Sequence, residues 1–240
     1  MKIYNPTNLP KNDNLNRFAF VVDVKEEIFI RKGKMIAFYG QLQFESLGSS
    51  LLDILTKEAF NAPLYINGFI IARGQGQLIL GDNGNDIACY DLDAANMTIK
   101  ASHLLGFTKN IVCQESTMQG FLTLIGSGKI IASSNGPVHF LDLPCRVDEQ
   151  AVLGWADCPS PSFRYDYEHV RGVLSSIGAL TGITLSGEEK QIDFSGQGTV
   201  LIQSSEQPLQ GNSGILHSIL AQLPSLNRQD LSSLNSSIKQ

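Results

Sequence analysis

The residues that come closest to a known chemical motif are "GSGK" at 126–129, the core of a phosphate-binding loop. A complete loop needs G-x-x-x-x-G-K-[ST], because backbone N–H groups wrap the phosphates and a hydroxyl holds magnesium. Its first Gly would fall at Thr123, and Ile130 stands where Ser or Thr is required. The following "KIIASSNGP" is typical of a strand that enters a turn, not of a helix. We therefore predict no nucleotide site here and no cofactor for the chain.

Metal or nucleophilic chemistry would have to come from dispersed residues. A cupin-type centre needs two His one residue apart, with a Glu and a further His. No two histidines of this chain are that close, and "GNSGI" at 211–215 lacks the G-x-S-x-G elbow of a serine hydrolase. His139 could still meet His103 or His169 in space, whereas His217 lies near the end of the chain. We predict no catalytic residue and no metal site, and keep a cupin-like metal- or small-molecule-binding enzyme as the alternative.

Composition excludes several partners. The 240 residues carry a net charge of −5, which disfavours nucleic acid, because phosphate backbones are bound by clustered Lys and Arg. No signal peptide is visible and no apolar run approaches the roughly 20 residues that span a bilayer. We expect a cytoplasmic protein with no integral membrane span. Its widely spaced cysteines predict free, mostly buried thiols; they are Cys89, Cys113, Cys145 and Cys158.

Two motifs, each occurring three times, predict the elements of the fold. The first, here called the turn motif, has a β-branched residue, four variable residues, two aliphatics, a small residue and an aromatic. Its occurrences are "IRKGKMIAF" (30–38), "IKASHLLGF" (99–107) and "VDEQAVLGW" (147–155). An internal repeat on this scale points to one β unit present three times.

The second, here called the glycine motif, is Gly-x-Gly followed by an apolar strand. The glycine pairs are Gly74 and Gly76, Gly126 and Gly128, and Gly196 and Gly198. Glycine within a strand usually marks a bulge or a close approach of two backbones, so these pairs have a structural role without any ligand. Asn-Gly in "GDNGND" (81–86) and "SSNGPV" (133–138) predicts tight hairpin turns.

Helical spacing of apolar residues appears at three places, and it predicts short helices over 49–60, 168–180 and 212–223. We predict one β domain over 1–210, with units at about 18–80, 81–132 and 133–204. Residues 211–240 are predicted to be a helix with a loose polar tail.

One surface is a candidate for recognition. Aromatic residues and Arg gather around "CPSPSFRYDY" (158–167), and such residues favour interface hot spots. Packing of this loop over the end of the β structure is the other interpretation. The candidate interaction residues are Trp155, Phe163, Arg164, Tyr165 and Tyr167.

The glycine motif, "VDEQAVLGW" and above all the late "SGEEKQIDFSGQGTVLIQS" resemble the altered-inheritance-of-mitochondria 24 family, over about 18–204. The family is widespread in bacteria. The resemblance implies a fold related to the tryptophan RNA-binding attenuation protein, with β-sandwich or double-stranded β-helix units tripled in one chain. It also implies that members associate, with a trimer as one candidate state. It implies no established enzymatic activity and no catalytic residues.

The expected protein is therefore mostly β, with three sandwich-like or β-helix-like units in a pseudo-threefold arrangement and two or three short helices. Its expected function is that of a non-enzymatic scaffold or binding protein that forms homo-oligomers and meets an unidentified protein partner.

Overall fold

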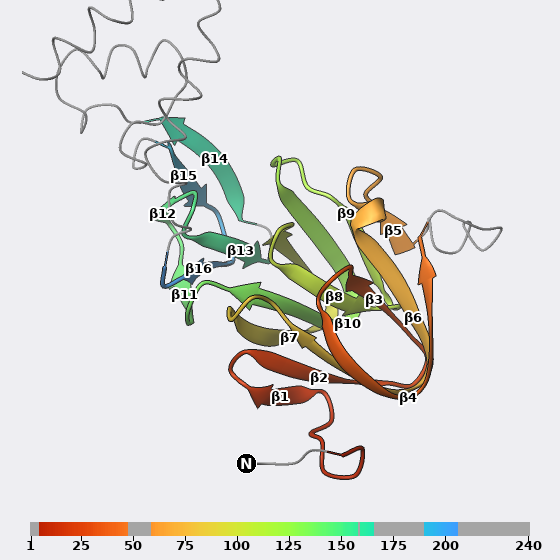
Figure 1. Ribbon diagram of the computed structural model, residues 1–240. Coiled ribbons are helices and arrows are strands. Elements are labelled where there is room, and N and C mark those ends of the chain that lie inside the picture. The colour runs from red at the N-terminus through yellow and green to blue at the C-terminus, as the bar shows by residue number, and fades with distance from the viewer. Residues whose placement is uncertain (1–4, 48–58, 158, 166–189, 206–240) are drawn as a thin grey trace, which may run out of the picture. The chain divides into compact units, whose positions relative to one another are not determined.

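The computed structural model describes residues 5–47, 59–157, 159–165 and 190–205, and these residues form mainly antiparallel strands (Figure 1). The prediction of a mostly β protein is confirmed. One turn of 3-10 helix, η1 (Ile66–Gly68), follows β5. The strands are β1 (Asp13–Asn16), β2 (Ala19–Val24), β3 (Glu27–Arg31), β4 (Met35–Ser46), β5 (Phe60–Asn61), β6 (Phe69–Gly81), β7 (Asp86–Lys100), β8 (Leu104–Thr108), β9 (Ile111–Glu115), β10 (Phe121–Ser134), β11 (Val138–Asp142), β12 (Cys145–Asp148), β13 (Val152–Ala156), β14 (Ser160–Tyr165), β15 (Lys190–Ser195) and β16 (Thr199–Gln203).

Most predicted helical segments lie outside the described residues, namely 49–58, 168–180 and 212–223. Phe60, the last residue of the first predicted helix, instead begins β5. The compact unit that holds the strands spans Met1–Glu206, and Gln207–Gln240 forms a second unit. The second unit lies outside the described residues, so the division into 1–210 and 211–240 stays a prediction.

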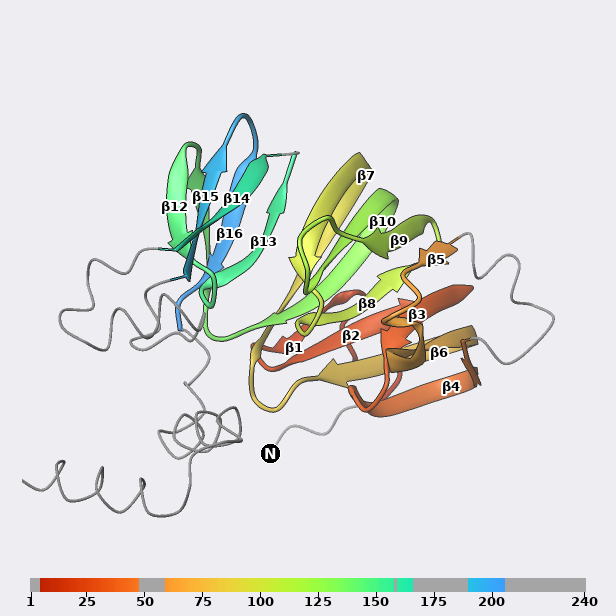
Figure 2. The same cartoon turned by 90° about the horizontal axis from the view of Figure 1, so that it is seen from above.

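The strands form a large sheet and a small one. The large sheet has thirteen strands in the order β1-β2-β6-β3-β8-β10-β7-β13-β16-β11, with β4 beside β6 and β9 beside both β10 and β5. The small sheet has the order β12-β15-β14. The longest pairing joins β7 to β10, which run side by side in Figure 2.

Apolar residues of the two motifs supply much of the core. Phe29 and Phe107 stack with their ring centroids 4.8 Å apart, in a cluster to which β6, β7, β8, β9 and β10 contribute most residues. A second cluster surrounds Trp155, which lies 4.9 Å from Phe121 and 5.5 Å from Phe194 between ring centroids. Full burial of one such side chain stabilises the fold by about 1.5 to 3 kcal/mol, so these positions tie the sequence motifs to the fold.

Every turn motif forms a strand, a turn and a second strand that carries a β-bulge. The bulge places one extra residue against the strand of the glycine motif, between Met35 and Ala37 in β4 and between Val152 and Gly154 in β13. In β8 the pairing with β10 shifts in the same way around Leu105. The extra residue is the second aliphatic of the motif in each case. The bulged residues are Ile36, Leu105 and Leu153.

Most glycines of the second motif lie where two backbones approach closely, whereas a Cβ on Gly196 would meet no atom closer than 3.9 Å. A Cβ on Gly76 would lie 2.2 Å from the carbonyl oxygen of Tyr39, and one on Gly126 would lie 2.4 Å from that of Asn110. Gly126 also has a φ of +134°, which favours glycine. Between Gly126 and Gly128 the register of β10 against β7 shifts by a bulge. A side chain at these positions would collide with main chain.

The Asn-Gly segments form turns, but the predicted hairpins are wrong. Asn83 and Gly84 have φ of 50° and 79°, and the N–H of Asn85 donates to the carbonyl of Asp82 at 2.8 Å. Yet β6 and β7, which flank this turn, are not neighbours, and neither are β10 and β11 at the second one. β6 already has β2 and β3 on one edge and β4 on the other, so the chain leaving the turn has to pair elsewhere.

Candidate functional site

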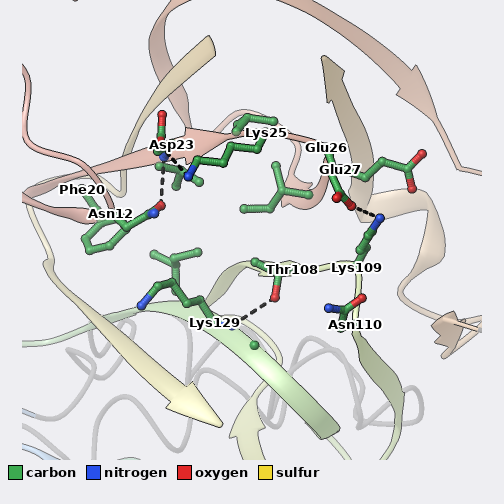
Figure 3. A pocket seen from close by; sticks show the side chains of 15 residues that line it. Asn12, Phe20, Asp23, Lys25, Glu26, Glu27, Thr108, Lys109, Asn110 and Lys129 are labelled. Atoms are coloured by element: carbon green, nitrogen blue, oxygen red, sulfur yellow. Dashed lines mark hydrogen bonds and ion pairs between the residues drawn. The ribbon is translucent and has the colours of Figure 1, made fainter. Parts of the chain in front are cut away.

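A pocket of about 340 Å³ lies where β2, β3 and β10 meet two turns (Figure 3). Lys25 and Glu26 come from the turn between β2 and β3, and Lys109 from the turn between β8 and β9. Gly128 and Lys129 of β10 line it as well, so part of the "GSGK" segment reaches a pocket. Figure 3 shows Lys129 and Thr108 on the side opposite Lys25.

The inner part of this pocket is apolar. The apolar side chains that line it belong to a core cluster with residues from β2, β3, β6 and β10. Their burial holds these strands together beneath the pocket. A floor of this kind suits the apolar part of a small molecule, because ligand pockets combine apolar walls with a few placed polar groups. The apolar lining residues are Phe20, Val22, Val24, Ile28 and Ile131.

The rim of the pocket has balanced charge. Lys109 forms an ion pair with Glu26, and Lys25 lies 3.9 Å from the carboxylate of Asp23. The lining residues include three lysines and three carboxylates, so their formal charges cancel. The lining therefore has no cationic surplus for a phosphate group.

Lys129 itself is already engaged. Its Nζ lies 2.5 Å from Asp91 Oδ1, and this hydrogen bond raises the pKa of Lys129. Its backbone N–H, which a phosphate loop would offer to its ligand, donates to Thr108 Oγ1 at 3.0 Å. Both groups of Lys129 thus have structural partners within the chain.

A buried cluster of Ser133, Asp82 and His103 has the residue types of a catalytic triad. The Ser133 hydroxyl donates to Asp82 Oδ2 at 2.5 Å, and His103 Nδ1 lies 3.5 Å from the same hydroxyl. Lys34 forms an ion pair with Asp82. Burial alone would raise the pKa of Asp82, but the hydrogen bonds from Lys34 and Ser133, with the charge of Lys34, lower it overall.

This cluster does not have the geometry of nucleophile activation. The Ser133 hydroxyl donates its hydrogen bond to the Asp82 carboxylate instead of the imidazole, and its side chain is completely buried. A hydrolase needs the base beside an accessible nucleophile. Burial, followed by the charge of Lys100, lowers the pKa of His103 to about 4, so the imidazole is neutral near pH 7. The residues lie 21 and 30 positions apart with no local motif, and sequence reasoning missed the cluster.

The predicted interaction surface around Trp155 needs correction. Trp155 is 5% exposed and packs between Phe121 and Phe194, so it belongs to the core instead of a surface. Phe163 on β14 is 40% exposed, with Lys190 Nζ 4.5 Å from its ring centroid. Arg164 beside it is exposed.

Two further residues of that surface are only partly tested. The backbone of Tyr165 pairs with Lys190 at the end of β14. Tyr167 lies outside the described residues.

The candidate metal ligands do not gather in the described part of the chain. No group of three or more His, Cys, Asp or Glu side chains there could hold an ion. His139 on β11 lies 2.9 Å from Ser204 Oγ through Nε2, whereas His103 is buried. His169 and His217 lie outside the described residues.

The cysteines of the described residues are free thiols. Cys113 is buried, whereas Cys89 and Cys145 are partly buried. Burial raises the pKa of Cys113 to about 12 and that of Cys89 to about 11, so both are protonated near neutral pH and weak as metal ligands. Cys158 lies outside the described residues.

A second candidate site is the outer edge of β4, a strand of twelve residues. Among the described strands β4 pairs only with β6, along its whole length (Figure 1). Three of its apolar side chains are exposed, Met35 by 36%, Ile36 by 64% and Phe38 by 44%, and Phe18 ahead of β2 is 44% exposed. Sequence reasoning did not identify this edge, because the turn motif that contains these residues has the same composition in all its occurrences.

None of the helices in the described ranges has the length and apolar character to cross a bilayer.

Comparison with known proteins identifies a family and solved structures with a similar fold. Residues 16–205 match the model of the family described as Mitochondrial biogenesis AIM24. A crystal structure of a Streptococcus pyogenes protein, solved as a structural genomics target, superposes with a TM-score of 0.58. It shares 18% sequence identity with this chain, and the match covers 88% of this chain and 95% of that one. No curated protein matches the sequence.

Proposed function

This chain belongs to the Mitochondrial biogenesis AIM24 family, and we propose that it is a non-enzymatic scaffold or binding protein that associates with copies of itself. The observation that carries the proposal is the edge of β4. An edge strand offers unpaired N–H and C=O groups, and soluble proteins normally protect such edges with charge, proline or a covering element. From Met35 to Gln43 this strand has no charged residue and no proline.

Exposed side chains support the same proposal. Met35, Ile36 and Phe38 follow one another closely on β4, and contiguous exposed apolar residues commonly mark an interaction site. Burial of a side chain such as Ile36 against a partner would contribute about 1.5 to 3 kcal/mol if complete. Neither the pocket nor the Ser133 cluster offers a comparable argument for catalysis.

We further propose that the chain is built from three related units, as the motifs predict. In each unit, the strand of the glycine motif is paired on both of its edges. Each edge is covered either by one long strand or by two shorter strands in succession. In the first unit, β2 with β3 and β4 flank β6. In the second, β7 and β8 with β9 flank β10. In the third, β11 with β12 and β13 with β14 flank β15 and β16.

Matching registers support this division. The first residue of each turn motif lies opposite the residue four positions before the first Gly of the glycine motif. The pairs are Ile30 with Ile70, Ile99 with Leu122, and Val147 with Ile192. A pseudo-threefold arrangement of sandwich-like units would follow from this division.

Sedimentation analysis of two variants tests self-association. Ile36→Lys places a charge on the β4 edge and should reduce the associated fraction at least tenfold. Leu64→Lys is the matched control, because Leu64 is 81% exposed but lies outside β4, and it should sediment like the parent protein. Self-association is refuted if the parent protein is a monomer, and the β4 edge is refuted as the contact if both variants associate equally.

A second candidate function is small-molecule binding in the pocket beside Lys129. Its apolar floor and balanced polar rim favour a neutral or zwitterionic ligand over a phosphate. Native mass spectrometry of protein purified under mild conditions tests this candidate. A bound small molecule that is lost in Ile131→Trp, which would fill the floor, would favour it over the scaffold proposal.

A further inference from the structure

Strands of successive units join at two places in one register. β3 joins β8 with Ile30 opposite Gly106, and β7 joins β13 with Ile99 opposite Gly154. Both contacts pair the first residue of one turn motif with the eighth residue of the next. This agreement defines a junction between units, in which the first strand of one unit covers the outer edge of the second strand of the next.

The same register has a third pair of positions that the described chain leaves unjoined. The first residue of the last turn motif is Val147 in β12, and the eighth residue of the first turn motif is Ala37 in β4. Among the described strands, β12 pairs only with β15, and β4 only with β6. Each strand therefore has one edge that no described strand covers.

The exposure of the aliphatic and aromatic residues of the turn motif depends on whether a strand covers the edge beside them. On β4, where no described strand covers the edge, Ile36 is 64% exposed and Phe38 is 44% exposed. Their counterparts on β8 and β13, where β3 and β7 cover the edge, are exposed by 5% or less. These counterparts are Leu105, Phe107, Leu153 and Trp155.

We propose that β12 of a second copy of the chain pairs antiparallel with β4, with Val147 of one copy opposite Ala37 of the other. The partner is a copy of this chain because, among the described strands, β12 carries the motif position that Ile30 of β3 and Ile99 of β7 hold at the other junctions. The inference rests on the proposed self-association and specifies its geometry. Since the two edges differ, the contact is head-to-tail. Each copy can pair through β12 with one neighbour and through β4 with another.

An exposed apolar side chain on the strand before β12 agrees with this geometry. β11, which precedes β12, ends the strand order of the large sheet, and its Phe140 is 62% exposed. A second copy seated through β12 would bring β11 near the partner as well. Exposed apolar residues thus lie on β4 and on β11, which is next to β12 in the chain.

Disulfide trapping between two differently tagged chains tests the register. All four native cysteines are replaced by Ala, and Ala37→Cys in one chain is mixed with Val147→Cys in the other under mild oxidation. We expect the mixed disulfide to form at least tenfold more than either like pair. The control pairs Ala37→Cys with Val112→Cys, at an exposed position of β9, and should give only background. Circular dichroism of each variant verifies that it is folded.

The outcomes separate the inference from the proposed function. If one chain carrying both cysteines closes on itself as a monomer, or if no mixed disulfide forms while light scattering still gives an oligomer, this geometry is wrong and self-association stands. If light scattering of the parent protein gives only a monomer, both fail. As a second variant, Phe38→Lys should reduce association at least tenfold and Phe163→Lys, at 40% exposure on β14, should not; equal effects would overturn the proposal.

Discussion

Ile36 and Leu105 are bulged residues at the same position of two turn motifs, yet Ile36 is 64% exposed and Leu105 is fully buried. Leu105 lies in a strand flanked by β3 and β10, whereas the strand of Ile36 has β6 as its sole described neighbour. The same local structure thus serves as core in one place and as open surface in another.

This contrast predicts opposite results for one type of substitution. Leu105→Ala should lower the free energy of unfolding by about 2 to 5 kcal/mol, because it leaves a cavity in the core. Ile36→Ala should change it by less than about 1 kcal/mol for the monomer while weakening association. Urea denaturation at low protein concentration measures both. Equal destabilisation by the two variants would contradict the exposed position of Ile36.

The close backbone approach at the glycine motif predicts a large cost for an added methyl group. Gly126→Ala should destabilise the fold by about 3 kcal/mol or more, because its Cβ would collide with the Asn110 carbonyl and its φ is positive. Gly33→Ala is the control, since Gly33 also has a positive φ of 76° but has no atom within 4 Å of the added Cβ. It should cost about 1 to 2 kcal/mol. Thermal unfolding compares the two, and a smaller cost at Gly126 would refute the steric argument.

Burial of His103 predicts a pH dependence of stability. Its pKa falls from 6.5 to about 4 in the folded protein, so the unfolded chain binds more protons between these values. Stability should therefore be constant above pH 6.5 with respect to this group and fall by about 3 kcal/mol as the pH drops to 4. Urea midpoints measured across this range test the slope. His103→Gln should flatten it, and an unchanged slope in that variant would assign the dependence to other groups.

Lys129 should contribute little to stability, and the protein should bind no nucleotide with or without it. Lys129→Gln removes a partly exposed ion pair with Asp91, which is worth about 1 kcal/mol or less. Calorimetric titration with ATP and magnesium should show no binding in either form. Saturable binding that disappears in the variant would overturn the structural interpretation of "GSGK".

Metal analysis checks the remaining alternative. Purified protein should contain no stoichiometric metal. His139→Ala should leave both fold and association unchanged, because His139 is exposed and loses only a surface hydrogen bond with Ser204. A bound metal that is lost in this variant would instead support the cupin-like enzyme.

Local features were predictable from the sequence because they depend on neighbouring residues. The turn motif predicted strands at Ile30, Ile99 and Val147, and the paired glycines predicted a bulge or a close backbone contact. Pairing was not predictable in the same way. The Asn-Gly turn at Asn83 has the backbone of a hairpin, but occupied edges on β6 force β7 to pair elsewhere.

The sites were harder to predict, because exposure depends on distant strands. Trp155 and Phe38 hold the same position of the turn motif. Trp155 is buried because β7 lies beside its strand and because it packs between Phe121 and Phe194, whereas Phe38 is 44% exposed on β4. The Ser133 cluster joins residues from three separate segments, which no local spacing could reveal.

Light scattering of the unmodified protein over a range of micromolar concentrations tests self-association most directly. The single chain has a mass of 26.2 kDa. We predict a mass that is a multiple of this value and that rises with concentration until association is complete. A mass of one chain at every concentration would contradict the account.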